Sequence, residues 1–388
     1  MITKLPIISS EMKNYLQELL GKNRSRKFLQ KATSPIEDYS LHIYQDLSVV
    51  DKIVNLLNKN DFNAKIHDIF PNLIICTPKG KSKLRLTGHL KEIIVDNQAA
   101  EMIYQGADVF IPGVKRANKV KKGDIIKVTN QKGIVVAKAK ALMSHHEILT
   151  KKHGIAAKNL VSPYQVPSLE QSGLKKYSIY FQSIPAFLTS MNLEPQSNER
   201  ILDCCAAPGN KTLHLSELLR NESKIIAVDR SKKRMQKLQN RVEKFKIKNI
   251  SIKIGNIIDF SKTWTVRFDK ILVDPPCSSL GLRPRLVFDT TVKMIKDLSK
   301  YQKAIIYACN SLLKLGGTMV YSTCTITKEE NEEIVSQLAE RYNFKIIEQK
   351  YHLSKMGSIG KEFDFPFQRF LPGQDNTLGY CIAKLRKN

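Results

Sequence analysis

The feature that most constrains this chain is a regular alternation of short apolar strands with helices, which begins near Tyr177 and continues toward the C-terminus. The expected order is RILDCCA at 200–206, a helix at 211–219, KIIAVD at 224–229, a helix at 231–245, ISIKIG at 250–255, KILVDPP at 270–276, a helix near 290–314 and TMVYST at 318–323. Such alternation is typical of α/β folds with a doubly wound, mostly parallel sheet. The strands are short and rich in β-branched residues, as expected when helices cover both faces of the sheet.

The length of 388 residues predicts two or three domains. Residues 1–90 mix helical periodicity, at 9–21 and 46–60, with short apolar runs, and we interpret them as an α/β region of unknown role. Residues 91–165 contain short β-rich runs bounded by Gly and Pro, which predict a small β-barrel and a connector. Residues 166–388 form the third expected domain, which contains the alternating pattern.

The charge balance favours a polyanionic partner. Lys and Arg number 63 against 36 Asp and Glu, which gives a net charge of +27. Fixed cations bind nucleic acid strongly because they release its condensed counterions. The alternative is that a Lys-rich composition only keeps the chain soluble. No apolar stretch approaches the roughly 18 residues of a membrane-spanning helix, and the first residues lack the apolar block of a signal peptide. We therefore expect a soluble, cytoplasmic protein with no membrane partner.

The seven cysteines include no Cys-x-x-Cys pair. The sequence therefore encodes neither a disulfide framework nor a zinc knuckle, and we expect no metal. Each cysteine is either a small core residue or a reactive thiol.

A small-residue loop after the first strand predicts a nucleoside cofactor. The strand ending at Asp203 continues into CCAAPGNKT at 204–212, where small residues let a ligand approach the backbone at the start of a helix. The next strand ends in Asp229, whose carboxylate can accept ribose hydroxyls. Asn256 follows the third strand and is expected near the adenine, with Asp259 as the alternative. Gly-x-Gly-x-x-Gly is absent, which favours S-adenosylmethionine over a nicotinamide cofactor.

Two thiols and a carboxylate are expected at the same edge of the sheet. Asp274 and Cys277 follow the fourth strand in DPPC, where two prolines stiffen the loop, and Cys324 follows the next strand. Beside S-adenosylmethionine, this set suggests methylation of a pyrimidine carbon. Carbon 5 of cytosine becomes nucleophilic once a thiolate has added to carbon 6.

The region from Tyr177 onward resembles the catalytic domain of the Sun-type (NSUN) RNA cytosine-5 methyltransferases. The matching motifs are CAAPGNKT at 205–212, DPPCSSLG at 274–281, YSTCT at 321–325, ENE at 330–332, RFLP at 369–372 and TLGYCIAKL at 377–385. The resemblance implies that Cys324 is the nucleophile, that Cys277 serves product release, that Asp274 holds the protonated cytosine and that Lys211 contacts the base or Asp274. It also implies a cofactor pocket lined by Cys205, Ala206, Ala207, Pro208, Gly209, Asn210, Lys211, Asp229, Asn256 and Asp274.

Residues 91–165 resemble a PUA domain, an RNA-binding module of many RNA-modifying enzymes. The resemblance lies in AAE at 99–101, GADVFIPGV at 106–114 and KGD at 122–124. Five nearby cations are candidates for phosphate contact, although such a run is also typical of a solvated face: Lys115, Arg116, Lys119, Lys121 and Lys122.

A PUA-like module ahead of the catalytic sheet resembles the subgroup of this family that methylates cytosine seventy-two at the acceptor end of tRNA. We therefore expect tRNA as the partner, with ribosomal RNA as the second choice, and a monomeric enzyme. Arg283 and Arg285 are expected at the substrate rim, where they could contact phosphates or a splayed base. The rival interpretations are a non-catalytic RNA-binding scaffold and an exocyclic-amine methyltransferase. Cys277 and Cys324 argue against both.

Overall fold

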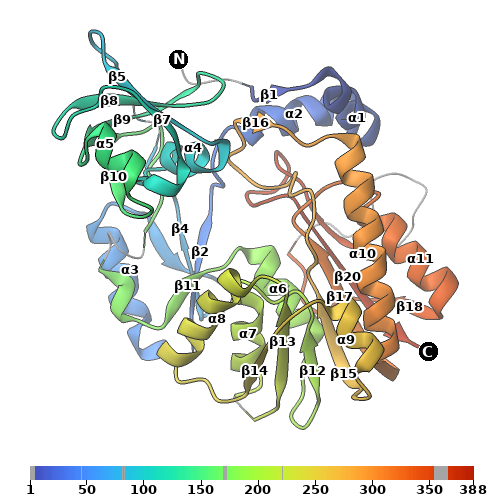
Figure 1. Cartoon of the computed structure of the whole chain (residues 1–388). Helices are drawn as coiled ribbons and strands as arrows, with labels where there is room; N and C mark the ends of the chain where they lie inside the picture. The colour runs from blue at the N-terminus through green and yellow to red at the C-terminus, as the bar shows by residue number, and fades with distance from the viewer. Residues whose placement is uncertain are drawn as a thin grey trace.

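The structure, a computed structural model of the whole chain, describes residues 5–44, 46–80, 82, 84–168, 173–220, 222–353 and 366–388. Its largest sheet has the strand order β14-β13-β12-β15-β17-β20-β18, and β19 also pairs with β20 (Figure 1). The first five strands in this order are parallel, whereas β20 runs antiparallel to its neighbours. The predicted doubly wound, mostly parallel sheet is confirmed. Its strands are β12 (Ile201–Asp203), β13 (Ile225–Asp229), β14 (Ile250–Ile254), β15 (Phe268–Val273), β17 (Leu313–Thr323), β18 (Phe344–Ile347), β19 (Gln368–Phe370) and β20 (Tyr380–Lys387).

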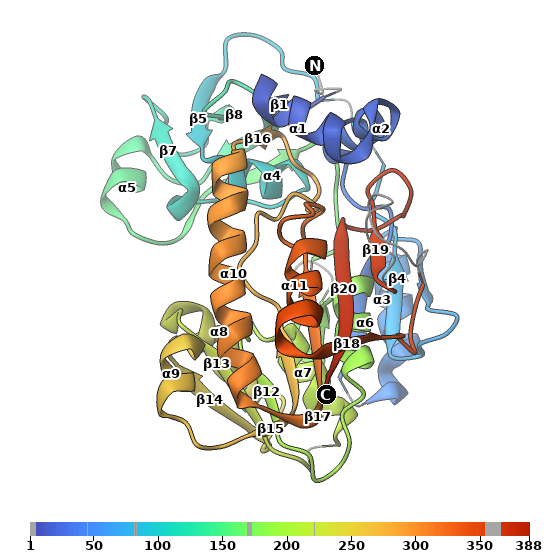
Figure 2. The same cartoon turned by 90° about the vertical axis from the view of Figure 1, so that its right-hand side faces the viewer.

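Helices cover both faces of this sheet (Figure 2). Successive residues of a strand point to opposite faces, so Ile201 and Leu202 of β12 belong to two different cores. Three helices pack on one face: α6 (Ile184–Leu193), α7 (Asn210–Leu218) and α8 (Lys232–Lys244). The other face carries α9 (Ile257–Thr263), α10 (Val292–Leu312) and α11 (Glu332–Tyr342). Among the described residues, no helix is both long and apolar enough to cross a membrane.

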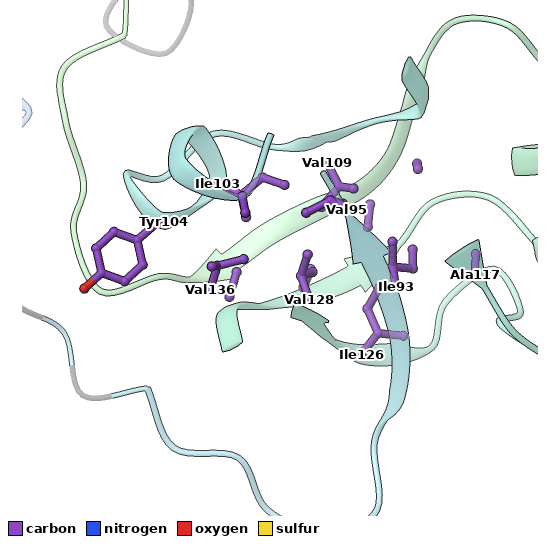
Figure 3. Close-up of a cluster of buried hydrophobic side chains, with 14 of the residues drawn as sticks. Ile93, Val95, Ile103, Tyr104, Val109, Ala117, Ile126, Val128 and Val136 are labelled. Carbon is purple, nitrogen blue, oxygen red and sulfur yellow. The ribbon is translucent and has the colours of Figure 1, made fainter. Parts of the chain in front are cut away.

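A second sheet forms the small β-rich domain that the sequence predicts. Its order is β6-β10-β9-β8-β5-β7, and Ile93, Val95 and Val128 lie in its buried core (Figure 3). Its strands are β5 (Lys91–Val95), β6 (Val109–Phe110), β7 (Val114–Ala117), β8 (Ile125–Asn130), β9 (Val135–Ala141) and β10 (Ile155–Val161). Two helices, α4 (Asn97–Tyr104) and α5 (His145–Thr150), and the 3-10 turn η2 (Ile111–Gly113) complete it. Asp96 caps α4 by accepting from the Ala99 amide at 2.8 Å.

The predicted boundary between residues 165 and 166 does not separate the N-terminal region from the catalytic part. A four-stranded antiparallel sheet, β11-β2-β4-β3, pairs β11 (Ile179–Phe181) with β2 (Tyr39–Ile43). The sheet also contains β3 (Ala64–Ile66) and β4 (Leu73–Cys76), and its core is shared with η1 (Leu47–Val49) and α3 (Val50–Lys59). A strand assigned to the third domain thus completes a sheet of residues 1–90, and the 3-10 turn η3 (Leu174–Lys176) precedes it.

The first helices pack on the catalytic part instead of on this small sheet. Apolar residues of α1 (Ser10–Leu20) and α2 (Lys22–Ala32) share a core with Leu280, Phe288 and Ile326. In addition, β1 (Ile7–Ile8) pairs in parallel with β16 (Val287–Phe288). Residues 1–90 therefore form two units that support the catalytic sheet, not one separate domain.

Candidate active site

Two thiols meet at the carboxyl edge of the parallel sheet. Cys277 follows β15 and Cys324 follows β17, two neighbouring parallel strands, so both loops leave the sheet at the same edge. The sulfur atoms lie 3.4 Å apart. Open α/β sheets bind their ligands at this edge. The structure therefore brings together the two cysteines that the sequence singles out.

The two thiols differ in proton affinity because one donates to the other. Donation from Cys277 lowers the pKa of Cys324, and the Ser279 hydroxyl, with its oxygen 3.4 Å from the sulfur, acts in the same direction against burial. The same hydrogen bond, together with burial, holds the pKa of Cys277 well above its usual value. The pair therefore favours the proton on Cys277 over the proton on Cys324, which is the direction that a nucleophile at Cys324 requires.

A carboxylate lies beside the thiols in a dense hydrogen-bond network. Asp274 accepts from the Lys211 ammonium at 2.5 Å and from the Ser322 hydroxyl at 3.0 Å. Tyr380 donates to the same carboxylate at 3.4 Å. Burial alone would lower the pKa of Lys211, but the adjacent Asp274 carboxylate and Tyr380 together outweigh burial and raise it. The Lys211 ammonium therefore stays charged and fixes the orientation of Asp274.

The loop that carries Cys277 is held by a fully buried carboxylate, Glu330. Glu330 accepts from the Ser278 amide at 2.8 Å, from the Ser278 hydroxyl at 2.5 Å and from the Gln302 amide group at 3.0 Å. Further along the same loop, Gly281 approaches the backbone of Gly379 so closely that an added Cβ would lie 2.1 Å from its oxygen. Both contacts restrict the position of the thiol.

The loop after β12 has the shape of a nucleoside pocket. Gly209 has φ +109°, and a Cβ there would lie 2.5 Å from Leu238, so the tight turn into α7 requires glycine. Asp229 at the tip of β13 accepts from the amides of Ala207 at 3.2 Å and Ser231 at 2.8 Å. Each of its oxygens keeps a lone pair that can accept a ribose hydroxyl. Asn256 follows the neighbouring strand and caps α9 through its side-chain oxygen.

One carboxylate that the sequence analysis did not select also fits the cofactor. Asp203 lies at the end of β12, and one of its oxygens accepts from Thr212 at 2.7 Å. The other oxygen is buried without a hydrogen-bond partner among the described residues, and Asp203 lines the central cavity. Burial raises the pKa of Asp203 to about 7, and Thr212 opposes this. A cation such as the ammonium of S-adenosylmethionine would complete this site. Its position at the strand end, directly before the loop, was the available signal.

The remaining predicted cofactor residues lie on the same loop. Cys205 to Lys211 all line the cavity, whereas Asp259, the alternative to Asn256, is exposed and pairs with Lys262 at 3.7 Å. Asn210 donates to the Phe181 carbonyl at 2.7 Å and accepts from Arg241. Asn210 therefore ties the cofactor loop to the N-terminal sheet instead of pointing freely into the pocket.

A large cavity of about 1350 Å³ joins the catalytic edge to the other two modules. From the catalytic part it is lined by Lys211, Asp274 and Ser279, and from the β-rich domain by Glu101 of α4 and by Gln105, directly after α4. Tyr39 of β2 also lines the cavity and donates to Gln105. The reactive groups thus face a space that extends to the predicted RNA-binding domain.

The predicted RNA-binding cations behave in two ways. Five of them are exposed on and after β7: Lys115, Arg116, Lys119, Lys121 and Lys122. The expectation that Arg283 binds phosphate is wrong, because its side chain is only 7% exposed and donates to the carbonyls of Lys31, Ser34 and Pro35 at 3.0–3.1 Å. A guanidinium that satisfies buried backbone oxygens is not available to a ligand. Arg285 lines the cavity and donates to the Ser279 carbonyl at 3.0 Å.

Glu101 connects the β-rich domain to the loop after the catalytic thiol. It accepts from the Leu286 amide at 2.9 Å and lies 4.0 Å from Arg285. Burial raises the pKa of Glu101 from 4.5 to about 7, and Arg285 opposes this. Between pH 4.5 and about pH 7, the folded protein therefore binds a proton at Glu101 that the unfolded chain does not bind. The free energy of unfolding falls as the pH rises through this range.

The variant Glu101→Gln should remove this proton uptake while it keeps an acceptor for the Leu286 amide. We expect it to raise the free energy of unfolding at pH 8 by on the order of 1–3 kcal/mol and to change little at pH 5. Thermal melts of both proteins at the two pH values measure this. Equal melting temperatures of the two proteins at pH 8 would contradict the raised pKa of Glu101.

Comparisons with known proteins agree with this architecture. Residues 190–386 match the family model described as 16S rRNA methyltransferase RsmB/F, and residues 91–161 match the PUA domain. The chain is 33% identical over 389 residues to the tRNA (cytosine(72)-C(5))-methyltransferase of Pyrococcus horikoshii, a match that covers 99% of this chain and 98% of that protein. It is 31% identical to tRNA (cytosine(72)-C(5))-methyltransferase NSUN6 of Homo sapiens, over 84% of this chain and 80% of that protein.

A solved structure shows the same fold over the full length. The crystal structure of NSun6 from Pyrococcus horikoshii with SFG, an S-adenosylmethionine analogue, superposes with a TM-score of 0.87 at 32% identity. It covers 98% of this chain and 99% of that one. The predicted cofactor, S-adenosylmethionine, and the predicted PUA domain are thereby confirmed. The chain belongs to the Sun/NSUN family of S-adenosylmethionine-dependent RNA cytosine-5 methyltransferases.

Proposed function

We propose that this enzyme methylates carbon 5 of cytosine seventy-two at the acceptor end of tRNA. The observation that carries the proposal is the end-to-end match, PUA domain included, to a tRNA (cytosine(72)-C(5))-methyltransferase. The cavity that joins Asp274 to the PUA helix α4 supports it, because a flexible 3′ end could lie along the PUA module while its neighbouring cytosine enters the catalytic edge. A cytosine paired in a stem must leave the stack to reach the thiols.

The residues support a covalent reaction. The Cys324 thiolate adds to carbon 6 of a cytosine that is protonated at ring nitrogen 3, and the Asp274 carboxylate accepts a hydrogen bond from that N–H, so that the adduct forms without a negative charge on the ring. S-adenosylmethionine supplies an electrophilic methyl group, which the activated carbon 5 then takes. A base then takes the proton from carbon 5, the electron pair of that C–H bond re-forms the double bond between carbons 5 and 6, and Cys324 leaves carbon 6 as a thiolate. Cys277, whose sulfur lies 3.4 Å from that of Cys324, assists this release.

Ribosomal RNA is the second candidate, because the matching family model is described as a 16S rRNA methyltransferase. That match covers residues 190–386 and leaves out the PUA domain, so it is weaker support than the full-length match. Bisulfite sequencing of total tRNA and rRNA, after incubation with the full-length enzyme and S-adenosylmethionine, separates the two. We expect new protected cytosines at position seventy-two of tRNA. Protection confined to rRNA would overturn the proposal.

If the exposed cations of the PUA domain bind phosphates, the affinity for tRNA should depend on the salt concentration. Replacing exposed Lys121 and Lys122 by Ala should weaken tRNA binding and flatten the slope of log K against log salt by about 0.9 for each phosphate that is no longer neutralised. Lys233 and Lys237 on α8 are equally exposed and form a matched control pair. An unchanged slope, or the same change in the control, would show that Lys121 and Lys122 belong to a solvated face.

A further inference from the structure

Helix α2 carries a strongly basic face that has no role in the proposed reaction or in the PUA domain. Its sequence, KNRSRKFLQKA, contains five cations and no acid. All five are exposed: Lys22, Arg24, Arg26, Lys27 and Lys31. Among the described residues only Lys31 has an ion-pair partner, Glu37 at 2.5 Å. We call these five residues the α2 basic face.

The opposite side of α2 is fixed in protein. Phe28, Leu29 and Ala32 are buried in a core shared with Leu280 and Phe288 of the catalytic part. The helix therefore presents its cations in a fixed orientation. An amphipathic helix that binds a membrane needs a free apolar face, and here that face is occupied, so the charge favours a nucleic acid over a lipid surface.

The end of α2 is attached to the rim of the active-site cavity. The Arg283 guanidinium donates to the carbonyls of Lys31 and Ser34, and the Arg285 amide donates to the Ala32 carbonyl at 2.6 Å. Both arginines line the cavity. Figures 1 and 2 place α2 at the same end of the molecule as the PUA domain. A substrate held by that domain would pass close to α2.

A small hollow lies within the basic face. It has a volume of about 70 Å³, several times the space that one water needs, and its lining from α1 and α2 consists of the cations Arg24 and Lys27 and the apolar Leu20 and Phe28. Across it lie Leu371, Pro372 and Gly373 of the loop after β19. A phosphate group at the mouth of the hollow would meet both cations at once, which resembles the way proteins position a nucleic-acid backbone.

We propose that the α2 basic face is a second RNA-binding surface, which holds substrate phosphates on the catalytic side of the cavity. The inference rests on the proposed function, because it takes the RNA substrate as its partner. It adds a surface outside the PUA domain, contributed by a helix near the start of the chain.

The test compares Arg24→Ala/Lys27→Ala with the control Lys233→Ala/Lys237→Ala in the full-length enzyme. We expect the α2 variant to raise KM for tRNA about tenfold, to leave kcat at saturating tRNA unchanged and to flatten the salt slope by about 0.9 for each phosphate that the two cations neutralise. The control should match the wild type. Equal effects in the two variants, or none in either, would overturn the inference.

Two further results keep this test separate from the proposed function. If the wild type methylates rRNA and not tRNA, the proposed function fails, and the same titration with rRNA still tests the α2 basic face. Vesicles containing phosphatidylserine form the second arm. If the α2 variant loses vesicle binding but keeps full RNA affinity, the surface binds lipid and the inference is wrong.

A different observation points to a further catalytic residue, Ser279. Its backbone has φ +55°, a conformation that favours glycine, and it forms no part of a regular element. In this position its hydroxyl oxygen lies 3.4 Å from the sulfur of Cys324 and 3.8 Å from that of Cys277. Arg285 holds its carbonyl at 3.0 Å. Strained residues that persist in a fixed site often serve its chemistry.

We infer that the Ser279 hydroxyl donates a hydrogen bond to the Cys324 thiolate and holds it ready for addition. The other groups that act on this sulfur are Cys277, Asp274 and Lys211. Of these, the hydrogen bond from Cys277 and the charge of Lys211 lower the pKa of Cys324, whereas the charge of Asp274 raises it. In the structure the Cys324 thiol donates to the Ser279 oxygen at 3.4 Å, and the Ser279 hydroxyl donates to the Cys277 carbonyl at 3.4 Å. Once Cys324 has lost its proton, the Ser279 hydroxyl can rotate to donate to the thiolate.

Ser279→Ala and Ser279→Gly test this inference together. Both remove the hydroxyl, but only glycine also relieves the backbone. We expect both to lower kcat about tenfold with KM values unchanged, and to shift the pH midpoint of iodoacetamide alkylation at Cys324, followed by peptide mass spectrometry, about one pH unit upward. If glycine restores kcat, or the alkylation midpoint does not move in either variant, Ser279 has only a structural role.

Discussion

Cys324→Ala should abolish turnover, by at least about a thousandfold, and should form no covalent species with RNA. Cys277→Ala should instead accumulate a protein–RNA adduct that survives denaturing gel electrophoresis, because addition to carbon 6 remains possible while release is obstructed. The asymmetry follows from the different roles of the two thiols, one in addition and one in release, although their sulfur atoms lie only 3.4 Å apart. The double variant should show no adduct.

The same hydrogen bond predicts how the adduct depends on pH. Donation from Cys277 lowers the pKa of Cys324, so its removal raises that pKa and leaves less thiolate at neutral pH. Adduct formation by Cys277→Ala should therefore accelerate as the pH rises from about 7 to about 9, near the ordinary thiol pKa, which quenched gel assays measure. An adduct in Cys324→Ala instead would reverse the roles of the two thiols, and normal turnover in either variant would exclude the mechanism.

Asp274→Asn should lower kcat by about 100- to 10,000-fold, the range for loss of a group that handles a proton in the reaction. The substitution keeps the shape of the side chain but removes the charge that Lys211 faces at 2.5 Å. Single-turnover methyl transfer with labelled S-adenosylmethionine measures the effect. Calorimetry should show a loss of cofactor affinity much smaller than the loss in kcat, because Asp274 is one of many residues that line the cofactor pocket.

Ser322→Ala is the matched control for this variant. It removes one donor to Asp274, at 3.0 Å, and leaves the carboxylate and its ammonium partner in place. We expect a loss of less than about tenfold. A kcat near that of the wild type in Asp274→Asn, or a loss explained by cofactor affinity, would contradict the proton-holding role.

The catalytic sheet was predictable from local sequence patterns. Neighbouring parallel strands end at the same edge of a sheet, so the order of the strands alone places Asp274, Cys277 and Cys324 close together. The structure confirms this placement. The loop of small residues before α7 could also be predicted, because small residues and the start of a helix are both visible in the local sequence. For the same reason Asp203 could have been selected, since it ends the strand that enters that loop.

The features that the sequence did not predict correctly depend on contacts between segments that lie far apart in the chain. Strand β11 pairs with β2, which lies far earlier in the chain, and three residues carry no periodicity that would reveal the partner. Arg283 is an ordinary basic residue in the sequence. Only the docking of α2 places backbone carbonyls around its guanidinium. The left-handed turn at Ser279 likewise has no local signature, because serine seldom adopts it.

The position of β20 has a consequence for how the enzyme is made. This strand is the last of the large sheet in chain order, yet it lies between β17 and β18 and pairs with both. Until residues 380–387 have been synthesised, the strand that leads to Cys324 has an open edge. One edge of β17 is therefore exposed to mispairing until β20 has left the ribosome and paired with it.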